Sequence, residues 1–166
     1  MTSEEKNMKK FNIQLLFLLL FAIPAFSQES SIIKSRSSEA NNEALSGIPD
    51  EILKKCSTFF ETLIARQTEN ALNVFLKNSP VTERKDQVQE LIFEIQRANK
   101  LYGDMQSYEP VSSEIVTSSY IRVRYLSYHN YFPMRWILTF YKSPAFGWIT
   151  TNIKYDDMSE NFFRYE

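Results

Sequence analysis

Three polar side chains in the segment 104–109 are of types that catalyse proton transfer. They are Asp104, Tyr108 and Glu109. A carboxylate in an apolar pocket can act as a general base, because its surroundings shift its pKa, and a nearby tyrosine hydroxyl can act as a donor. These residues are the candidate catalytic set of a small isomerase or hydrolase. The alternative is that the acids lie in solvent at strand ends.

Other reactive side chains are few. The chain has one histidine, His129, and one cysteine, Cys56. A structural zinc site needs about four such ligands, and three glycines are too few for a phosphate-binding loop. We therefore expect no metal and no cofactor. His129 is expected beside a turn with its ring in solvent, and Cys56 is expected to pack in the core. The sequence favours a non-catalytic domain over an enzyme.

Aromatic residues make up 14% of the chain and are the main candidates for contact with a ligand. Tyr125, Trp136, Phe140 and Tyr155 are expected on one face of a sheet, with Tyr102 near its rim. They form either ordinary core or a pocket for a small apolar ligand, in which the hydroxyl and indole groups need polar partners. The sequence leaves both interpretations open.

The opposite face of the same sheet is expected to mix charged and apolar side chains. Its candidate interface residues are Arg122, Arg124, Leu126, Arg135, Ile137, Tyr141 and Trp148. Arginine and aromatic residues are enriched in protein interfaces. We expect this face to bind a second copy of the chain or another protein, the alternative being a solvated outer surface.

The N-terminus has the layout of a cleaved secretory signal, expected at residues 1–27. Lysines precede an unbroken apolar run from Leu15 to Ile23, and small residues flank the expected cleavage point after Ser27. This run is shorter than a membrane-spanning helix, which needs about 20 apolar residues. We expect an exported bacterial protein, periplasmic or secreted, with no stable membrane span after cleavage. The alternative is an uncleaved domain tethered at the cell surface.

The remaining chain divides into a linker and one domain. Residues 28–46 are rich in Ser, Glu and Asn, which predicts a flexible linker, and residues 47–166 form the expected domain. The net charge of −1 gives no attraction to nucleic acid. With a single cysteine the domain has no internal disulfide, so its apolar core must stabilise it.

Helical periodicity fills the first half of this domain. Apolar residues recur every three to four positions over 49–64, 68–76 and 82–101. Thr68 and Thr82 are the expected N-caps of the second and third helices. Gly103 stands where a C-terminal cap glycine belongs.

After Gly103 the apolar period changes to two, which predicts strands. The strands are expected at 105–116 with a bend at Pro110, at 120–129, at 133–142 and after a turn at 144–145. Together with the helices they predict an α+β domain. About three helices pack on the concave face of a curved antiparallel sheet of four or more strands.

The register of the sheet follows from keeping the apolar residues on one face. The short connection after His129 places Tyr125 opposite Trp136. The next hairpin is expected to continue the alternation. It puts Ile149, Thr151, Ile153 and Tyr155 on the same face as Trp136 and leaves Trp148 on the other.

Within 49–157 this order of elements is combined with Ala71-Leu72, Asn78-Ser79-Pro80, Tyr102-Gly103, Tyr108-Glu109, the segments 120–125 and 136–142, and Gly147-Trp148. On these residues the chain resembles the nuclear-transport-factor-2-like fold, also called the cystatin-like cone. The resemblance implies helices that close over the concave sheet, a hydrophobic pocket at the wide end and a frequent homodimer through the outer sheet face. The fold hosts many functions, so the resemblance implies none in particular.

Overall fold

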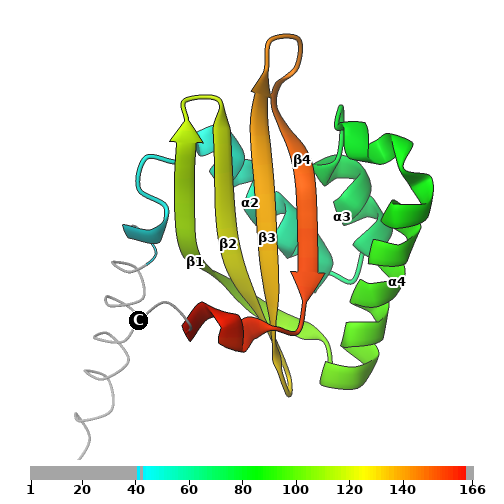
Figure 1. Ribbon diagram of the computed structural model, residues 1–166. Helices are drawn as coiled ribbons and strands as arrows, with labels where there is room; N and C mark the ends of the chain where they lie inside the picture. Colours follow the sequence, from blue (N-terminus) through cyan, green and yellow to red (C-terminus); the bar gives the residue numbers. More distant parts are fainter. Residues whose placement is uncertain (1–40, 42, 164–166) are drawn as a thin grey trace, which may run out of the picture. The chain divides into compact units, whose positions relative to one another are not determined.

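The computed structural model describes residues 41 and 43–163 (Figure 1). The expected secretory signal and residues 28–40 of the expected linker lie outside the described residues. The described part is an α+β unit in which three α-helices pack against a curved four-stranded antiparallel sheet. This architecture confirms the predicted fold class. In Figure 1 the sheet faces the viewer and helix α2 crosses behind it.

Helix α2 spans Asp50–Ile64 and supplies the largest apolar contribution from the helices. Its buried side chains recur at helical spacing, so they form one stripe that faces the sheet. They are Ile52, Cys56, Phe59, Phe60 and Leu63. The negative charges of Asp50 and Glu51 in the first turn favour the helix, because the N-terminus carries a partial positive charge.

Helices α3, Thr68–Phe75, and α4, Lys85–Tyr102, follow as predicted, but their expected caps are wrong. Thr68 is itself helical and buried, and Gln67 precedes the helix. A short 3-10 helix, η1 at Pro80–Glu83, precedes α4, and its cap is the Ser79 hydroxyl, which accepts from the Val81 N–H at 3.1 Å. Proline at the first helical position favours this early start.

Gly103 ends α4, as predicted, and fixes the helix against the sheet. Its φ of +81° lies in the region that favours glycine. A Cβ at this position would lie 2.7 Å from the Cβ of Asn130, and the Tyr131 N–H donates to the Tyr102 carbonyl at 2.9 Å. The last turn of α4 is therefore held against the turn around Asn130 and Tyr131.

The four strands are β1 (Met105–Thr117), β2 (Tyr120–His129), β3 (Pro133–Ser143) and β4 (Gly147–Asp156), in spatial order β1-β2-β3-β4. β1 has three irregularities in its pairing with β2, and one of them directly follows Pro110, where the bend was predicted. Tyr125 lies opposite Trp136 in β2 and β3, which confirms the predicted register.

The register of β4 is where the sequence prediction fails. Trp136 lies opposite Tyr155, as expected, but an irregularity after Thr139 leaves Thr151 unpaired, and Phe140 lies opposite Thr150. An extra residue reverses the alternation beyond it. Trp148 therefore belongs to the buried core instead of the outer face.

The last described segment returns to the outer face of the sheet. The segment η2, Ser159–Phe163, contacts β3, and the Arg135 guanidinium lies 5.9 Å from the centre of the Phe162 ring. This contact covers one end of the outer face. Phe163, the last residue of η2, is 83% exposed.

Candidate functional site

The structure does not bring the three candidate catalytic residues together. Tyr108 lies opposite Ser127 on the helix-facing side of β1, and its ring stacks on Phe60 with 4.5 Å between centroids. Glu109 is the next residue, so it belongs to the other face, where it accepts a hydrogen bond of 3.1 Å from the Tyr128 hydroxyl. A joint role for Tyr108 and Glu109 would require them on one face.

Asp104 lies apart from Tyr108 and Glu109. It precedes β1 and forms an ion pair with Arg66, which is the first residue after the end of α2 and its cap. Burial raises the pKa of Tyr108, and the negative charge of Glu61 acts in the same direction. A tyrosine with a raised pKa keeps its proton, so Tyr108 serves as a packed ring with a neutral hydroxyl.

The expected ligand pocket on the helix-facing side of the sheet is filled by phenylalanines of the helices. Trp136 is 1% exposed and Phe140 is fully buried. The Trp136 ring meets those of Phe59 and Phe60 edge-on at 5.4 and 5.6 Å, and Phe75 meets Phe140 in the same way at 5.9 Å. Edge-to-face pairs of this kind stabilise a core. These rings form core, one of the two interpretations that the sequence left open.

A buried hydrogen-bond chain continues from Trp136. Its indole N–H donates to the Ser127 hydroxyl at 2.9 Å, and that hydroxyl lies 3.5 Å from Nε2 of His129. Nδ1 of His129 is 2.8 Å from the Gly103 carbonyl. The distances fit one arrangement, in which Nδ1 carries the proton and Nε2 accepts from Ser127.

This chain corrects the prediction for His129. The ring is buried at the end of β2 instead of solvated beside a turn. Burial lowers the pKa of His129, and the Gly103 hydrogen bond and the Asp104 charge oppose that shift. The pair of Ser127 and His129 resembles a nucleophile with its base, but Ser127 is fully buried, so no substrate reaches it. Its role is structural.

Replacing Ser127 with alanine is expected to lower the free energy of unfolding by about 2 kcal/mol, because it leaves the buried Trp136 N–H and His129 Nε2 without a partner. Urea unfolding followed by tryptophan fluorescence measures the change. Ser112→Ala on the outer face of β1 is the matched control and should cost far less, because its hydroxyl accepts a single long hydrogen bond of 3.5 Å from Arg124. Equal effects of the two substitutions would contradict the role of the chain.

Tyr155 and Tyr102, the other expected ligand contacts, lie at one end of the sheet. The Tyr155 ring is 4.2 Å from that of Trp136, and its hydroxyl is buried without a partner among the described residues. Burial raises the pKa of Tyr155, and the charge of Glu94 adds to the effect. Tyr102 donates to Asp157 at 3.3 Å. Neither residue lines the cavity between α2 and α3 or the one between α3 and α4.

Cys56 is fully buried on α2, as predicted. Burial raises the pKa of its thiol to about 12, against smaller opposing effects of Tyr125 and Lys55. The thiolate is the nucleophile in cysteine chemistry, so Cys56 is a packing residue.

The outer face of the sheet carries most of the predicted interface residues. Arg124 is 3.1 Å from the Glu114 carboxylate, and Arg122 is 3.5 Å from the same oxygen. Ile137 lies opposite Arg124 in the neighbouring strand. Two arginines that share one carboxylate are held in place across β1 and β2, and they retain donors for a partner.

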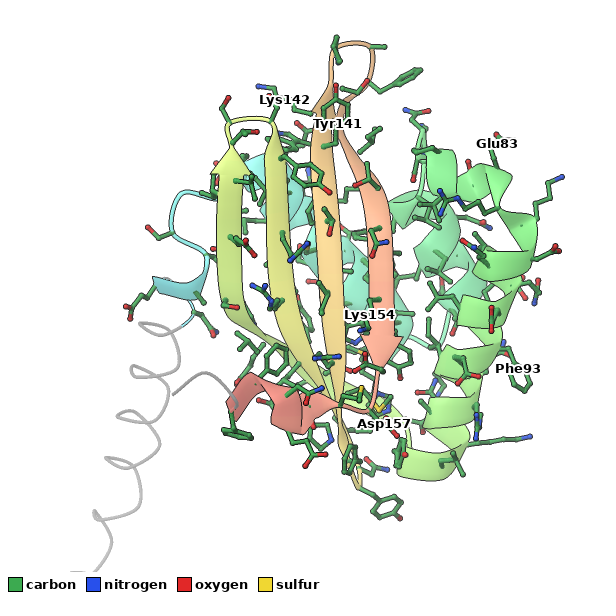
Figure 2. All side chains as sticks on the ribbon, viewed as in Figure 1. Glu83, Phe93, Tyr141, Lys142, Lys154 and Asp157 are labelled. Atoms are coloured by element: carbon green, nitrogen blue, oxygen red, sulfur yellow. The ribbon has the colours of Figure 1, made fainter. Side chains whose placement is uncertain are left out.

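Tyr120 and Tyr141 form the most exposed row of this face. They lie opposite each other in β2 and β3 and are 41% and 39% exposed. Figure 2 shows Tyr141 and Lys154 on the side of the sheet away from the helices. Leu126 and Arg135 lie opposite each other nearer to η2, and Arg135 is buried, with its Nε and Nη2 donating to the Asp156 carboxylate.

The larger of the two described cavities, about 640 Å³, lies between the start of α3 and α4. Its lining is polar: Arg66, Gln67, Thr68, Glu69, Asn70, Asn73, Gln96 and Asn99. The smaller, about 220 Å³, lies between α2 and α3. Its lining combines apolar side chains with two lysines: Glu51, Lys54, Lys55, Thr58, Phe59, Thr62, Ala71, Val74 and Phe75.

Sequence reasoning missed the cavity between α2 and α3. The usable signal is the position of Lys55, three residues after Ile52 and four before Phe59, beside the apolar stripe. A lysine at such a position extends over apolar surface toward the neighbouring helix. The other half of the cavity comes from α3, and the angle between the two helices is not encoded in either segment alone.

Within the described residues, no group of three His, Cys, Asp or Glu side chains could hold a metal ion. The same part of the chain contains no helix long and apolar enough to cross a membrane. Comparisons with protein-family models, curated proteins and solved structures found no match to this chain.

Proposed function

We propose that this chain is an exported, non-catalytic binding domain that forms a symmetric dimer through the outer face of its sheet. The observation that carries the proposal is the exposed pair of Tyr120 and Tyr141, which continues into the fixed arginines of the same face. Tyrosine and arginine are the residues that most often dominate binding energy in interfaces. The partner is a second copy of the chain.

Charge complementarity favours a second copy. Glu109 and Glu114 lie on β1, at one side of the face, and Lys154 lies on β4, at the other. A two-fold axis parallel to the strands places β1 of each copy over β4 of its partner, because the same surface meets itself in such dimers. Acidic and basic side chains then meet at both edges of the face.

Two finer proposals accompany the dimer. The positively charged start and apolar run of residues 1–27 support export with cleavage of that segment. The element order and the curved sheet support membership of the nuclear-transport-factor-2-like cones. In this member the aromatic side chains of the helices fill the space that the family resemblance assigns to a pocket.

Replacing both Tyr120 and Tyr141 with alanine is expected to weaken the dimer at least tenfold, since each buried interface tyrosine contributes about 1–2 kcal/mol. Sedimentation equilibrium of the chain, expressed with its own N-terminal segment and purified after processing, measures the dissociation constant. Lys154→Glu should also weaken the dimer, because it places like charges opposite each other.

Phe93→Ala is the matched control. Phe93 is 60% exposed on α4, away from the sheet face (Figure 2), so its removal should leave the dissociation constant unchanged. A wild-type chain that sediments as a monomer at every accessible concentration would refute the dimer. Equal weakening by Phe93→Ala would place the interface elsewhere.

A further inference from the structure

The cavity between α2 and α3 has the composition of a site for an amphiphilic anion. Its floor is apolar, formed by Phe59, Ala71, Val74 and Phe75. Lys54 and Lys55 also line it and carry two positive charges. Small-ligand sites commonly combine an apolar lining with a few polar groups that fix orientation.

Lys55 is held over the cavity in an unusual environment. Its ammonium lies 5.7 Å from the centre of the Phe75 ring, and its hydrogen-bond partner among the described residues is the Trp148 carbonyl at a long 3.5 Å. Burial lowers the pKa of Lys55, while Cys56 and Glu51 oppose the shift. A half-buried ammonium with one weak hydrogen bond gains when an anion supplies acceptors.

The charge balance of the lining still favours an anion. Glu51 is one turn before Lys55 and supplies the one carboxylate of the cavity, against the two lysines. The remaining polar groups are the hydroxyls of Thr58 and Thr62. Thr62 donates to the Thr58 carbonyl at 2.6 Å and can accept, but it has no free proton for a ligand. Thr58 retains its hydroxyl proton as a donor.

The volume limits the size of the apolar group. The cavity measures about 220 Å³. An apolar cavity of about 150 Å³ in another protein is large enough to hold benzene. One aromatic ring or a short branched chain with its carboxylate therefore fits, whereas a long acyl chain does not.

We propose that the groove between α2 and α3 binds a small organic carboxylate with one aromatic or branched aliphatic group. The apolar part packs on Phe59, Val74 and Phe75, and the carboxylate accepts from the ammonium groups of Lys55 and Lys54. This site faces away from the outer sheet surface, so it is independent of the proposed dimer and is tested separately.

Phenylacetate, phenylacetamide and phenethylamine are the probes, since they share a ring and differ in charge. Titration of the full chain, followed by calorimetry and by NMR of labelled methyl groups, should show phenylacetate binding at least tenfold more tightly than the other two. The methyl signals of Ala71 and Val74 should shift, and those of Ile137 on the outer face should not.

Lys55→Met keeps most of the apolar stem and removes the charge. It should weaken phenylacetate at least tenfold and leave the affinity for phenylacetamide unchanged. Lys85→Met, at the exposed start of α4, is the matched control and should alter neither. Circular dichroism verifies that each variant is folded.

If Lys55→Met fails to fold, the titrations of the wild-type protein with the three probes still test the proposal. Equal affinity for the acid and the amide would exclude recognition by the lysines. Methyl shifts confined to other parts of the chain, or no binding of phenylacetate, would overturn the site. None of these outcomes depends on the oligomeric state of the chain.

Discussion

Replacing Asp156 with alanine is expected to lower the free energy of unfolding by about 3 kcal/mol. Arg135, which it pairs with, is only 8% exposed, and the two form hydrogen bonds of 2.9 and 2.7 Å. Without the carboxylate, the nearly buried guanidinium loses both of these hydrogen bonds and the opposite charge beside it. Equilibrium unfolding in urea, followed by fluorescence, measures the loss.

Two variants separate this pair from other effects of the substitution. Asp157→Ala removes the neighbouring carboxylate, which is exposed, and should cost far less. Arg135→Met combined with Asp156→Leu replaces both charges by apolar groups and should recover most of the lost stability, because no unpaired charge remains. A double variant as unstable as Asp156→Ala would show that packing, rather than the uncompensated charge, causes the loss.

The same pair predicts a pH dependence with a definite sign. Burial alone would raise the pKa of Asp156, but the hydrogen bonds from Arg135 and the Met158 N–H, with the charges of Arg135 and Lys154, lower it below its ordinary value of 3.8. The contribution to stability is therefore fully present above that value and is lost as the pH falls through the folded-state pKa. The difference in the free energy of unfolding between the wild-type protein and Asp156→Asn should therefore shrink as the pH falls through this acid range.

Replacing Trp136 with alanine is expected to lower the free energy of unfolding by about 4 kcal/mol. The indole is 1% exposed and contacts the rings of Phe59, Phe60 and Tyr155. Its loss leaves a cavity at the centre of the core and removes the hydrogen bond that the Ser127 hydroxyl accepts. Thermal and urea unfolding measure the loss, with Trp148 as the remaining fluorescent probe.

Trp136→Phe separates the two contributions. It keeps an aromatic ring but removes the N–H, so its cost should be clearly smaller than that of alanine. Phe163→Ala is the control for removing an aromatic side chain, since Phe163 is 83% exposed and should contribute little. A loss from Trp136→Ala no larger than that control would contradict the central place of the indole in the core.

The sequence alone predicts the three helices and the pairing of β2 with β3, because both depend on local periodicity. The apolar residues of β2 and β3 share a face in only one kind of register, and the short turn after His129 selects Tyr125 opposite Trp136. Cys56 was placed in the core for the same reason.

The errors arise where contacts between distant segments determine the strand register or the surroundings of a side chain. In β4, Thr150 donates its hydroxyl to the Phe75 carbonyl of α3 at 3.2 Å, and the strand accommodates this contact through its irregularity at Thr151. Nothing in the alternation of 147–156 indicates an extra residue. His129 was likewise misplaced, because its partner Gly103 is 26 residues away.

The candidate site also divides into a part that local periodicity predicts and a part that contacts between distant segments determine. The outer face was predicted because its arginines and tyrosines alternate with core residues along single strands. Whether the helix-facing aromatic residues form a pocket depends on how closely α2 approaches the sheet, and Phe59 and Phe60 fill that space. The cavity beside Lys55 needs the angle between two helices, which periodicity does not specify.

The rows of backbone donors and acceptors at both edges of the sheet are interrupted, and this affects whether folded copies can pair through their edge strands. β1 contains Pro110, which has no N–H to donate, and three irregularities. At the other edge, the Ser79 hydroxyl donates to the Thr150 carbonyl and so takes up an acceptor of β4. Fibrils and swapped sheets grow by adding strands to an uninterrupted edge. Within the described residues neither edge offers such an uninterrupted run, so both edges disfavour growth by backbone pairing between folded copies.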